Sequence, residues 1–234
     1  MKLRACYFLF SVLSAHAVYA DLTIVQKVEG IREGGQITIK IKGTKARIEA
    51  TPQLTMIVDA QTGDMMNLMN DQKAVVRISA EKMKAAMETI RKFNGEGENT
   101  KKPKLVATGK RETINGYETE QYSYETPKLK ATYWIAPKYA NAPSILKQLE
   151  VLNSGAWKPK DMLMVNYTDF PGVPIKSVVT VNGTEVTTTV MAIKEDSLSD
   201  SEFAVPKDFQ ELTPPEMKMA PGGNHSAPTA SATP

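Results

Sequence analysis

The sequence predicts a mainly β (α+β) domain: a strongly curved antiparallel sheet or half-open barrel, with two amphipathic helices packed on its concave face. Three observations lead to this fold class. Apolar and polar residues alternate with a period of two through most of the chain, glycine-containing turns separate the alternating runs, and two short stretches show helical spacing instead. A sheet with one apolar face needs a covering layer, and two helices with one apolar face each can provide it.

The alternation recurs in short runs along the chain. Leu22 and Ile24 open the first run, and comparable runs occupy residues 37–41, 46–50 and 54–58. Each run is typical of a strand with one buried and one solvated face. The later runs are KLVATGKRETI, GYETEQYSYE, LKATYWIA, MLMVNYTDF, IKSVVTV and TEVTTTVMAI. Roughly ten to twelve strands in an antiparallel meander are therefore expected.

Glycine dipeptides mark the hairpin turns between these runs. Asn-Gly in particular supplies the positive φ angles that a two-residue hairpin needs. The turns predicted in this way are Lys42-Gly43, Thr62-Gly63, Asn115-Gly116 and Asn182-Gly183.

Two stretches have helical rather than strand spacing. SAEKMKAAMETIRKF, at 79–93, begins with Ser79 as the expected N-cap and carries a methionine stripe. PSILKQLEVL, at 143–152, begins with Pro143 in the first turn and is followed by Gly155. Both stretches are predicted to be amphipathic helices.

The N-terminus resembles a secretory signal peptide. Lys2 and Arg4 precede an apolar run at 5–13, and a small residue, Ala20, ends the segment. We expect cleavage after Ala20, with Ala17 as the alternative, and export to the periplasm of a Gram-negative-type bacterium. No later stretch approaches the ~20 apolar residues of a transmembrane helix, so a membrane-spanning protein is not expected.

Loss of this segment changes the chemistry open to the protein. It removes the only cysteine, Cys6, and one of the two histidines, which leaves His225 in the C-terminal tail. A domain without Cys or His has no disulfide, no cysteine nucleophile, no Ser-His-Asp triad, and no imidazole or thiolate metal site. We therefore expect no enzyme activity, no cofactor and no metal. Losing Lys2 and Arg4 also lowers the formal net charge of +3 by two, so no nucleic-acid partner is expected.

Composition divides the mature chain into one domain and a tail. Residues 21–212 suit a single β domain, with a polar loop at 94–103 between its halves. From residue 213 the sequence TPPEMKMAPGGNHSAPTASATP is rich in Pro, Gly, Ser, Thr and Ala. We predict that residues 213–234 form a disordered tail.

Methionines are the most informative side chains of the domain. The stretch LTMIVDAQTGDMMNLMNDQKAVVRIS, at 54–79, carries four of them. Core filling, a soft lining for an apolar ligand, and a thioether copper site are the three interpretations considered. If the interior is hollow, the lining predicted is Met56, Met66, Met83, Met87, Ile90, Leu146 and Leu149.

Carboxylates and aromatic residues suggest weaker alternatives. Asp59 and Asp64 flank the predicted turn at Thr62-Gly63, where solvated turn aspartates are the simpler reading than an acid/base pair. Tyr122, Tyr124 and Trp134 lie on successive predicted strands and can stack across the sheet or form an outward carbohydrate platform.

Several of these stretches together resemble a known family. The run at 54–79, followed by ATGKRETINGYETEQYSYE and ATYWIAP, resembles exported bacterial proteins grouped as a domain of unknown function. That family looks similar in architecture to the lipoprotein carrier LolA, its receptor LolB and the stress sensor RseB. The resemblance implies a curved antiparallel sheet closed by a helical lid over an apolar cavity.

Fold class and resemblance lead to one functional expectation and two alternatives. The first is a periplasmic, non-enzymatic binding protein that holds a lipid, an acylated peptide or another apolar ligand between sheet and helical lid. The second is a periplasmic interaction or regulatory protein with a packed core and an envelope protein as partner. A carboxylate-based hydrolase is the third.

Overall fold

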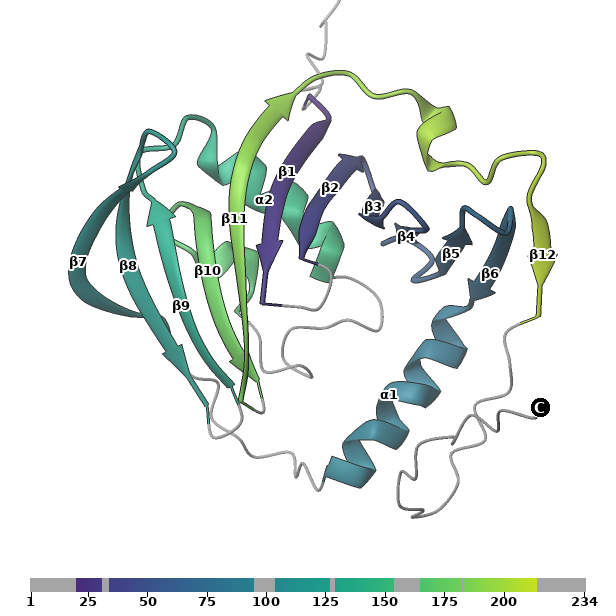
Figure 1. The fold of residues 1–234 in the computed structure, drawn as a ribbon, viewed down its shortest axis with the longest axis horizontal. Helices are drawn as coiled ribbons and strands as arrows, with labels where there is room; N and C mark the ends of the chain where they lie inside the picture. The colour runs from purple at the N-terminus through teal and green to yellow at the C-terminus, as the bar shows by residue number, and fades with distance from the viewer. Residues whose placement is uncertain are drawn as a thin grey trace, which may run out of the picture.

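The computed structural model describes residues 20–30, 34–94, 104–126, 129–153, 165–181 and 183–213. Within these ranges the chain forms one sheet and two α-helices, with three short 3-10 helices between them (Figure 1). The strands are β1 (Leu22–Glu29), β2 (Gly35–Lys42), β3 (Lys45–Thr51), β4 (Leu54–Asp59), β5 (Met65–Met69), β6 (Ala74–Ile78), β7 (Val106–Ile114), β8 (Tyr117–Glu125), β9 (Leu129–Ala136), β10 (Val173–Val181), β11 (Thr184–Glu195) and β12 (Gln210–Leu212). The helices are α1 (Ala80–Asn94), α2 (Ala142–Leu149), η1 (Glu150–Asn153), η2 (Tyr167–Asp169) and η3 (Asp200–Phe203). Residues 1–19 of the predicted signal peptide, 95–103 of the predicted polar loop and 214–234 of the predicted tail lie outside the described residues.

The sheet consists of two meanders joined side by side. Its strand order is β12-β6-β5-β4-β3-β2-β1-β11-β10-β9-β8-β7, so β1 and β11 connect the two halves. All neighbours are antiparallel except β12, which runs parallel to β6. The mainly β class with a largely antiparallel sheet is therefore confirmed.

The expected strong curvature and half-open barrel are wrong. The sheet is not strongly curled, and its two edges, β7 and β12, do not pair with each other. A barrel closes only when its edge strands meet in a matching stagger. Here one edge is the three-residue β12 and the other is β7, whose side chains are exposed except for Ile114.

Three predicted hairpin turns, Lys42-Gly43, Thr62-Gly63 and Asn115-Gly116, occur where the sequence places them. Asn182 of the fourth lies outside the described residues. Asn115 and Gly116 have φ angles of 49° and 82°, and Ile114 pairs with Tyr117 across the turn. Two successive positive φ angles match the twist of the flanking strands, which is why Asn-Gly is favoured there.

The two predicted helices also form, with different degrees of burial. Ser79 caps α1, since its Oγ accepts a hydrogen bond of 3.3 Å from the amide of Lys82. None of the described side chains of α1 is buried, and Met83 is half-buried. By contrast, Ile145 and Leu149 of α2 share a buried cluster with strand residues. Packing of a helix on the sheet is therefore shown for α2 alone among the described residues.

One predicted strand is absent. MLMVNYTDF was expected to be extended, but within its described part, 165–170, residues Tyr167–Asp169 form the 3-10 helix η2. Val165 and Phe170 are buried on either side of it, beneath α2, because they pack with Leu146 and Tyr133. The apolar residues of this stretch are therefore buried because the segment covers the sheet, and not because it forms a strand within the sheet.

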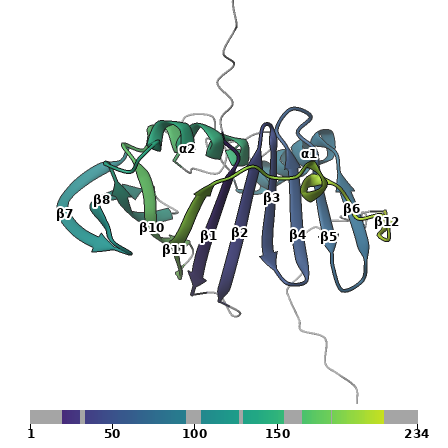
Figure 2. The same ribbon diagram turned by 90° about the horizontal axis from the view of Figure 1, so that it is seen from above.

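The sheet has two faces that are covered by different segments. Ile39, Ile48 and Met56 face each other across β2, β3 and β4 on the face toward α2, which we call the inner face. Residues 196–209, here called the strap, cross the opposite, outer face before the chain enters β12 (Figure 2). Phe203 of the strap is buried, and Val205 and Phe209 pack against Ile57, Leu68 and Val75.

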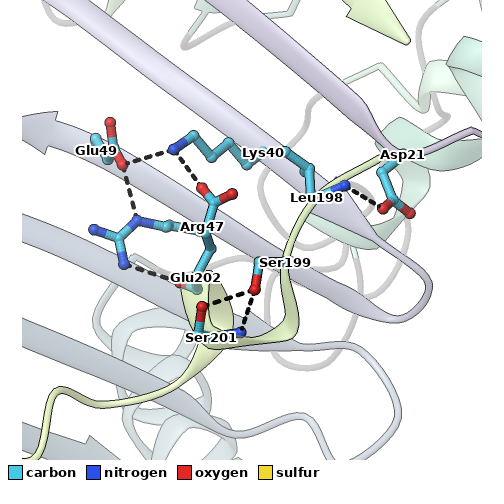
Figure 3. Close-up of polar contacts among 8 residues, drawn as sticks. All are labelled: Asp21, Lys40, Arg47, Glu49, Leu198, Ser199, Ser201 and Glu202. Atoms are coloured by element: carbon cyan, nitrogen blue, oxygen red, sulfur yellow. Dashed lines mark hydrogen bonds and ion pairs between the residues drawn. The ribbon is translucent and has the colours of Figure 1, made fainter. Parts of the chain in front are cut away.

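Ion pairs attach the strap to the outer face (Figure 3). Lys40 Nζ lies 2.5 Å from Glu202 Oε2, and Arg47 Nη1 donates to the Glu202 carbonyl at 2.9 Å. Arg47 Nε also donates a hydrogen bond of 2.9 Å to Glu49 Oε1. Lys40, Arg47, Glu49 and Glu202 thus form a network of two cations and two carboxylates. At the start of the strap, the amide of Leu198 donates to Asp21 Oδ2 at 2.8 Å.

This network predicts a loss of stability in acid. A hydrogen bond from Lys40 holds the pKa of Glu202 below its usual 4.5, and one from Lys42 lowers the pKa of Asp200. A carboxyl whose pKa is lower in the folded than in the unfolded chain stabilises the fold above its unfolded pKa. That contribution is lost as the pH falls through the folded pKa. We expect the free energy of unfolding, measured by urea titration, to fall between about pH 5 and about pH 3.

Glu202→Gln is the matched variant for this experiment. It keeps the shape of the side chain and removes the titration, so its free energy of unfolding should fall less over the same range. An identical fall in both proteins would show that Glu202 is not linked to folding.

Candidate functional site

A pocket lies between the inner face of the sheet and the layer made by α2, η1 and η2. Its volume is about 200 Å³. Strands β1, β2, β9, β10 and β11 form one wall, and α2 with the residues around η2 forms the other. Most of the lining is apolar and includes Ile24, Ile39, Leu149, Val165, Phe170, Ile175, Val179 and Val190.

Two tyrosines give the pocket neutral hydroxyl groups. Tyr133 and Tyr167 both line it, and the Tyr133 ring meets Phe170 edge-on with centroids 5.0 Å apart. Burial raises the pKa of Tyr133 to about 12, and burial also raises the pKa of Tyr167. Both phenols therefore stay protonated at neutral pH and can donate hydrogen bonds.

Three buried polar atoms around α2 and the adjoining strands have no hydrogen-bond partner. They are Asn153 Nδ2, Gln148 Nε2 and Tyr124 Oη. An unpartnered buried polar group costs about 1–3 kcal/mol, so such groups are uncommon in packed interiors. Of the three residues, only Asn153 lines the pocket. The pocket therefore combines apolar walls with one hydrogen-bond donor that nothing in the described protein satisfies.

Charge is turned away from this pocket. Lys176 is the one charged residue of its lining, and its Nζ lies 4.7 Å from the ring centroid of Trp134. Lys176 pairs directly with Trp134 across β9 and β10, whereas the neighbouring Tyr133 pairs with Ser177. Because successive side chains point to opposite faces, the ammonium of Lys176 lies on the face away from Tyr133 and the pocket.

The structure brings together only part of the predicted lining. Leu149 lines the pocket, and Leu146 is buried next to it with Tyr133 and Phe170. Met56 is half-buried on the same inner face, farther along the sheet. Met66 pairs with Ile57 and lies beneath the strap. It is therefore on the outer face, away from the predicted lining residues at the inner face. Met83 is half-buried on α1, and the side chains of Met87 and Ile90 lie outside the described part of the chain.

Several pocket residues were not predicted from the sequence. Asn153, Val165 and Phe170 come from stretches that suggested a helix end and a strand. By contrast, Leu149 was predicted from the sequence, because the helical spacing of apolar residues in α2 is clear. The position of Asn153 at the end of η1 depends on how the chain continues after α2, which no periodic pattern reports.

The turn aspartates have structural roles. Asp59 Oδ1 accepts hydrogen bonds from the Gln61 amide at 2.9 Å and from Thr44 Oγ1 at 3.1 Å. Asp64 Oδ1 accepts from the amide of Ala80 at 3.1 Å, at the start of α1. Such hydrogen bonds to nearby backbone amides are typical of aspartates in turns and at helix starts. Within the described ranges, no group of three His, Cys, Asp or Glu side chains is placed to hold a metal ion.

Two larger hollows lie on the surface and have a different character. One, of about 430 Å³, is lined mostly by charged and polar residues of β7 and β8, and Arg111 and Glu120 there form an ion pair of 2.8 Å. The other, of about 560 Å³, lies around Gly30 and Gly35. Its apolar side chains are Val28 and Met191, which lie beside Lys27, Glu29 and Gln36. The helices of the described chain are also too short or too polar to cross a bilayer.

Comparison with known protein families identifies the family of this chain. A family described as "Domain of unknown function (DUF4412)" matches residues 21–209. The chain belongs to the DUF4412 family. The resemblance to a domain-of-unknown-function family is thereby confirmed, and the DUF4412 match contains both meanders and the strap. A comparison with curated proteins gives no match.

Solved structures resemble the DUF4412 domain only distantly. A structure of PNGF-II has 14% identity and a TM-score of 0.39, with 83% of this chain and 31% of that chain covered. A DUF1329 family protein from Desulfovibrio piger has 13% identity and a TM-score of 0.32 over 80% and 90% of the two chains. LprF from Mycobacterium bovis has 13% identity and a TM-score of 0.33 over 82% and 91%. This chain thus spans about a third of PNGF-II, and likeness at this distance supports no conclusion about function.

Proposed function

We propose that the mature DUF4412 domain is an exported, non-enzymatic binding protein that holds an apolar chain, such as an acyl group, between its sheet and α2. The observation that carries the proposal is the pocket itself, with its apolar lining from both layers. A mostly apolar pocket that also contains polar groups is the usual form of a small-molecule site. The signal-peptide-like N-terminus supports export.

The dimensions of the pocket limit the ligand. A volume of about 200 Å³ lies below the ~300 Å³ at which drug-sized pockets begin. One short alkyl chain, or the end of a longer one, fits this space. A two-chain lipid would have to leave most of its surface outside.

Ser177→Trp tests the proposal by filling the pocket. Ser177 is half-buried on β10 and lines the wall, and an aromatic residue suits a strand. We expect the indole to occupy the ligand volume and to weaken binding of the apolar fluorophore N-phenyl-1-naphthylamine at least about ten-fold, or 1.4 kcal/mol. Fluorescence titration of the mature chain measures the change.

Thr187→Trp is the matched control. Thr187 is also half-buried, adjoins the pocket residue Thr188 on β11, and points to the opposite face. It should bind the fluorophore like the wild type. A wild-type protein that takes up no probe would overturn the proposal and favour the alternative, an interaction protein with a packed core.

A further inference from the structure

The polar group at the Asn153 side of the pocket carries an inference about ligand chemistry, and it rests on the proposed function. Asn153 lies at the end of η1, lines the pocket, and holds a buried amide nitrogen without a partner. An amide nitrogen only donates, so the atom that satisfies it must be an acceptor. The amide group can rotate about the Cβ–Cγ bond of Asn153. Its nitrogen can therefore turn toward an acceptor in the pocket without any movement of the η1 backbone.

The charge of that acceptor follows from the rest of the lining. An ionised group in an apolar site needs a counter-charge, because burial without one is strongly unfavourable. The ammonium of Lys176 lies on the other face of the sheet, over Trp134. The remaining polar groups named in the lining are neutral: the Tyr133 and Tyr167 phenols, Gln26, Ser177 and Thr188. The described pocket therefore has nothing to balance a carboxylate.

We infer that the pocket binds the uncharged carbonyl end of an acyl chain, an ester or an amide, with Asn153 donating to the carbonyl oxygen, and that it disfavours a free fatty acid. The apolar walls take the chain, and the neutral donors take the oxygen. An acyl ester and an acylated amine share this chemistry, and the probes below separate the two sources.

Competition against N-phenyl-1-naphthylamine at pH 8, where octanoic acid is ionised, tests the inference on the mature chain. The competitors are methyl octanoate, N-methyloctanamide and octanoate, which share one chain length and differ in the polar end. Methyl octanoate or N-methyloctanamide should displace the probe at a concentration about ten-fold below that of octanoate. The tighter of the two neutral ligands identifies the ester or the amide as the source.

Asn153→Leu then assigns the donor. This variant removes the amide and should weaken the better neutral ligand about three- to ten-fold, the loss of one hydrogen bond, while it leaves probe binding intact. Gln148→Leu is the matched control, because Gln148 also has an unpartnered buried amide nitrogen but does not line the pocket. It should bind all three ligands like the wild type.

The outcomes separate failure of the inference from failure of the proposed function. Octanoate that competes as well as the ester and the amide would overturn the inference while the apolar site stands. An equal loss in Asn153→Leu and Gln148→Leu would overturn the role of Asn153. A probe that does not bind the wild type would overturn the proposed function itself.

Discussion

Replacing Ile145 by alanine is expected to lower the free energy of unfolding by about 3–4 kcal/mol, since a fully buried isoleucine loses most of its side chain. Ile145 is 0% exposed and attaches α2 to the sheet within the cluster that contains Ile24 and Ile39. The neighbouring structure can collapse only partly, because α2 is held to η1 and lies over η2. Urea unfolding of residues 21–234, followed by circular dichroism, measures the change.

Glu150→Ala provides the comparison for that variant. Glu150 is exposed directly after α2, so its replacement should change the free energy of unfolding by less than about 0.5 kcal/mol. A loss below about 1 kcal/mol in Ile145→Ala would mean that α2 is not docked on the sheet. The pocket described under α2 would then not exist in solution.

Replacing Phe203 by alanine should have the second large effect, a loss of about 3 kcal/mol. Phe203 is 4% exposed at the end of η3, where the strap contacts β3. Its ring anchors a segment that otherwise depends on partly exposed ion pairs, which contribute little singly. The same urea titration measures the loss, and limited proteolysis should show earlier cleavage within residues 196–209.

Phe203→Leu distinguishes burial from aromatic contact. Leucine retains much of the apolar volume, so this variant should lose less than about 1.5 kcal/mol. If Phe203→Ala is as stable as the wild type and resists protease equally well, the strap is not held on the outer face by Phe203.

Local patterns predicted the elements of this protein well. Alternation located most of the strands, and the Asn115-Gly116 turn and the Ser79 cap occur as expected, because each depends on residues adjacent in the chain. The pattern of MLMVNYTDF was misleading for a physical reason. A segment that covers a sheet buries residues at intervals just as a strand does, so Val165 and Phe170 carried no sign of which layer they belong to.

The sequence predicted an apolar pocket between sheet and helix, but it did not identify most of the residues that line it. Methionine content suggested a lining, but Met56 and Met66 lie on opposite faces of the sheet. With a period of two, the ten-residue separation would put them on one face of a single strand. They lie on different strands, and the register between β4 and β5 decides the outcome.

The sequence by itself determined the mainly β class, the two helices, the main hairpin turns, and the absence of Cys and His from residues 21–212. These properties follow from composition and from contacts between residues near in the chain. Only the tertiary structure decided that the sheet stays open, that the strap covers its outer face, and that the pocket forms under α2. Each of these depends on segments far apart in sequence, such as Lys40 with Glu202 and Ile24 with Leu149. Periodicity tells which side of an element is apolar, but pairing and register determine which elements meet there.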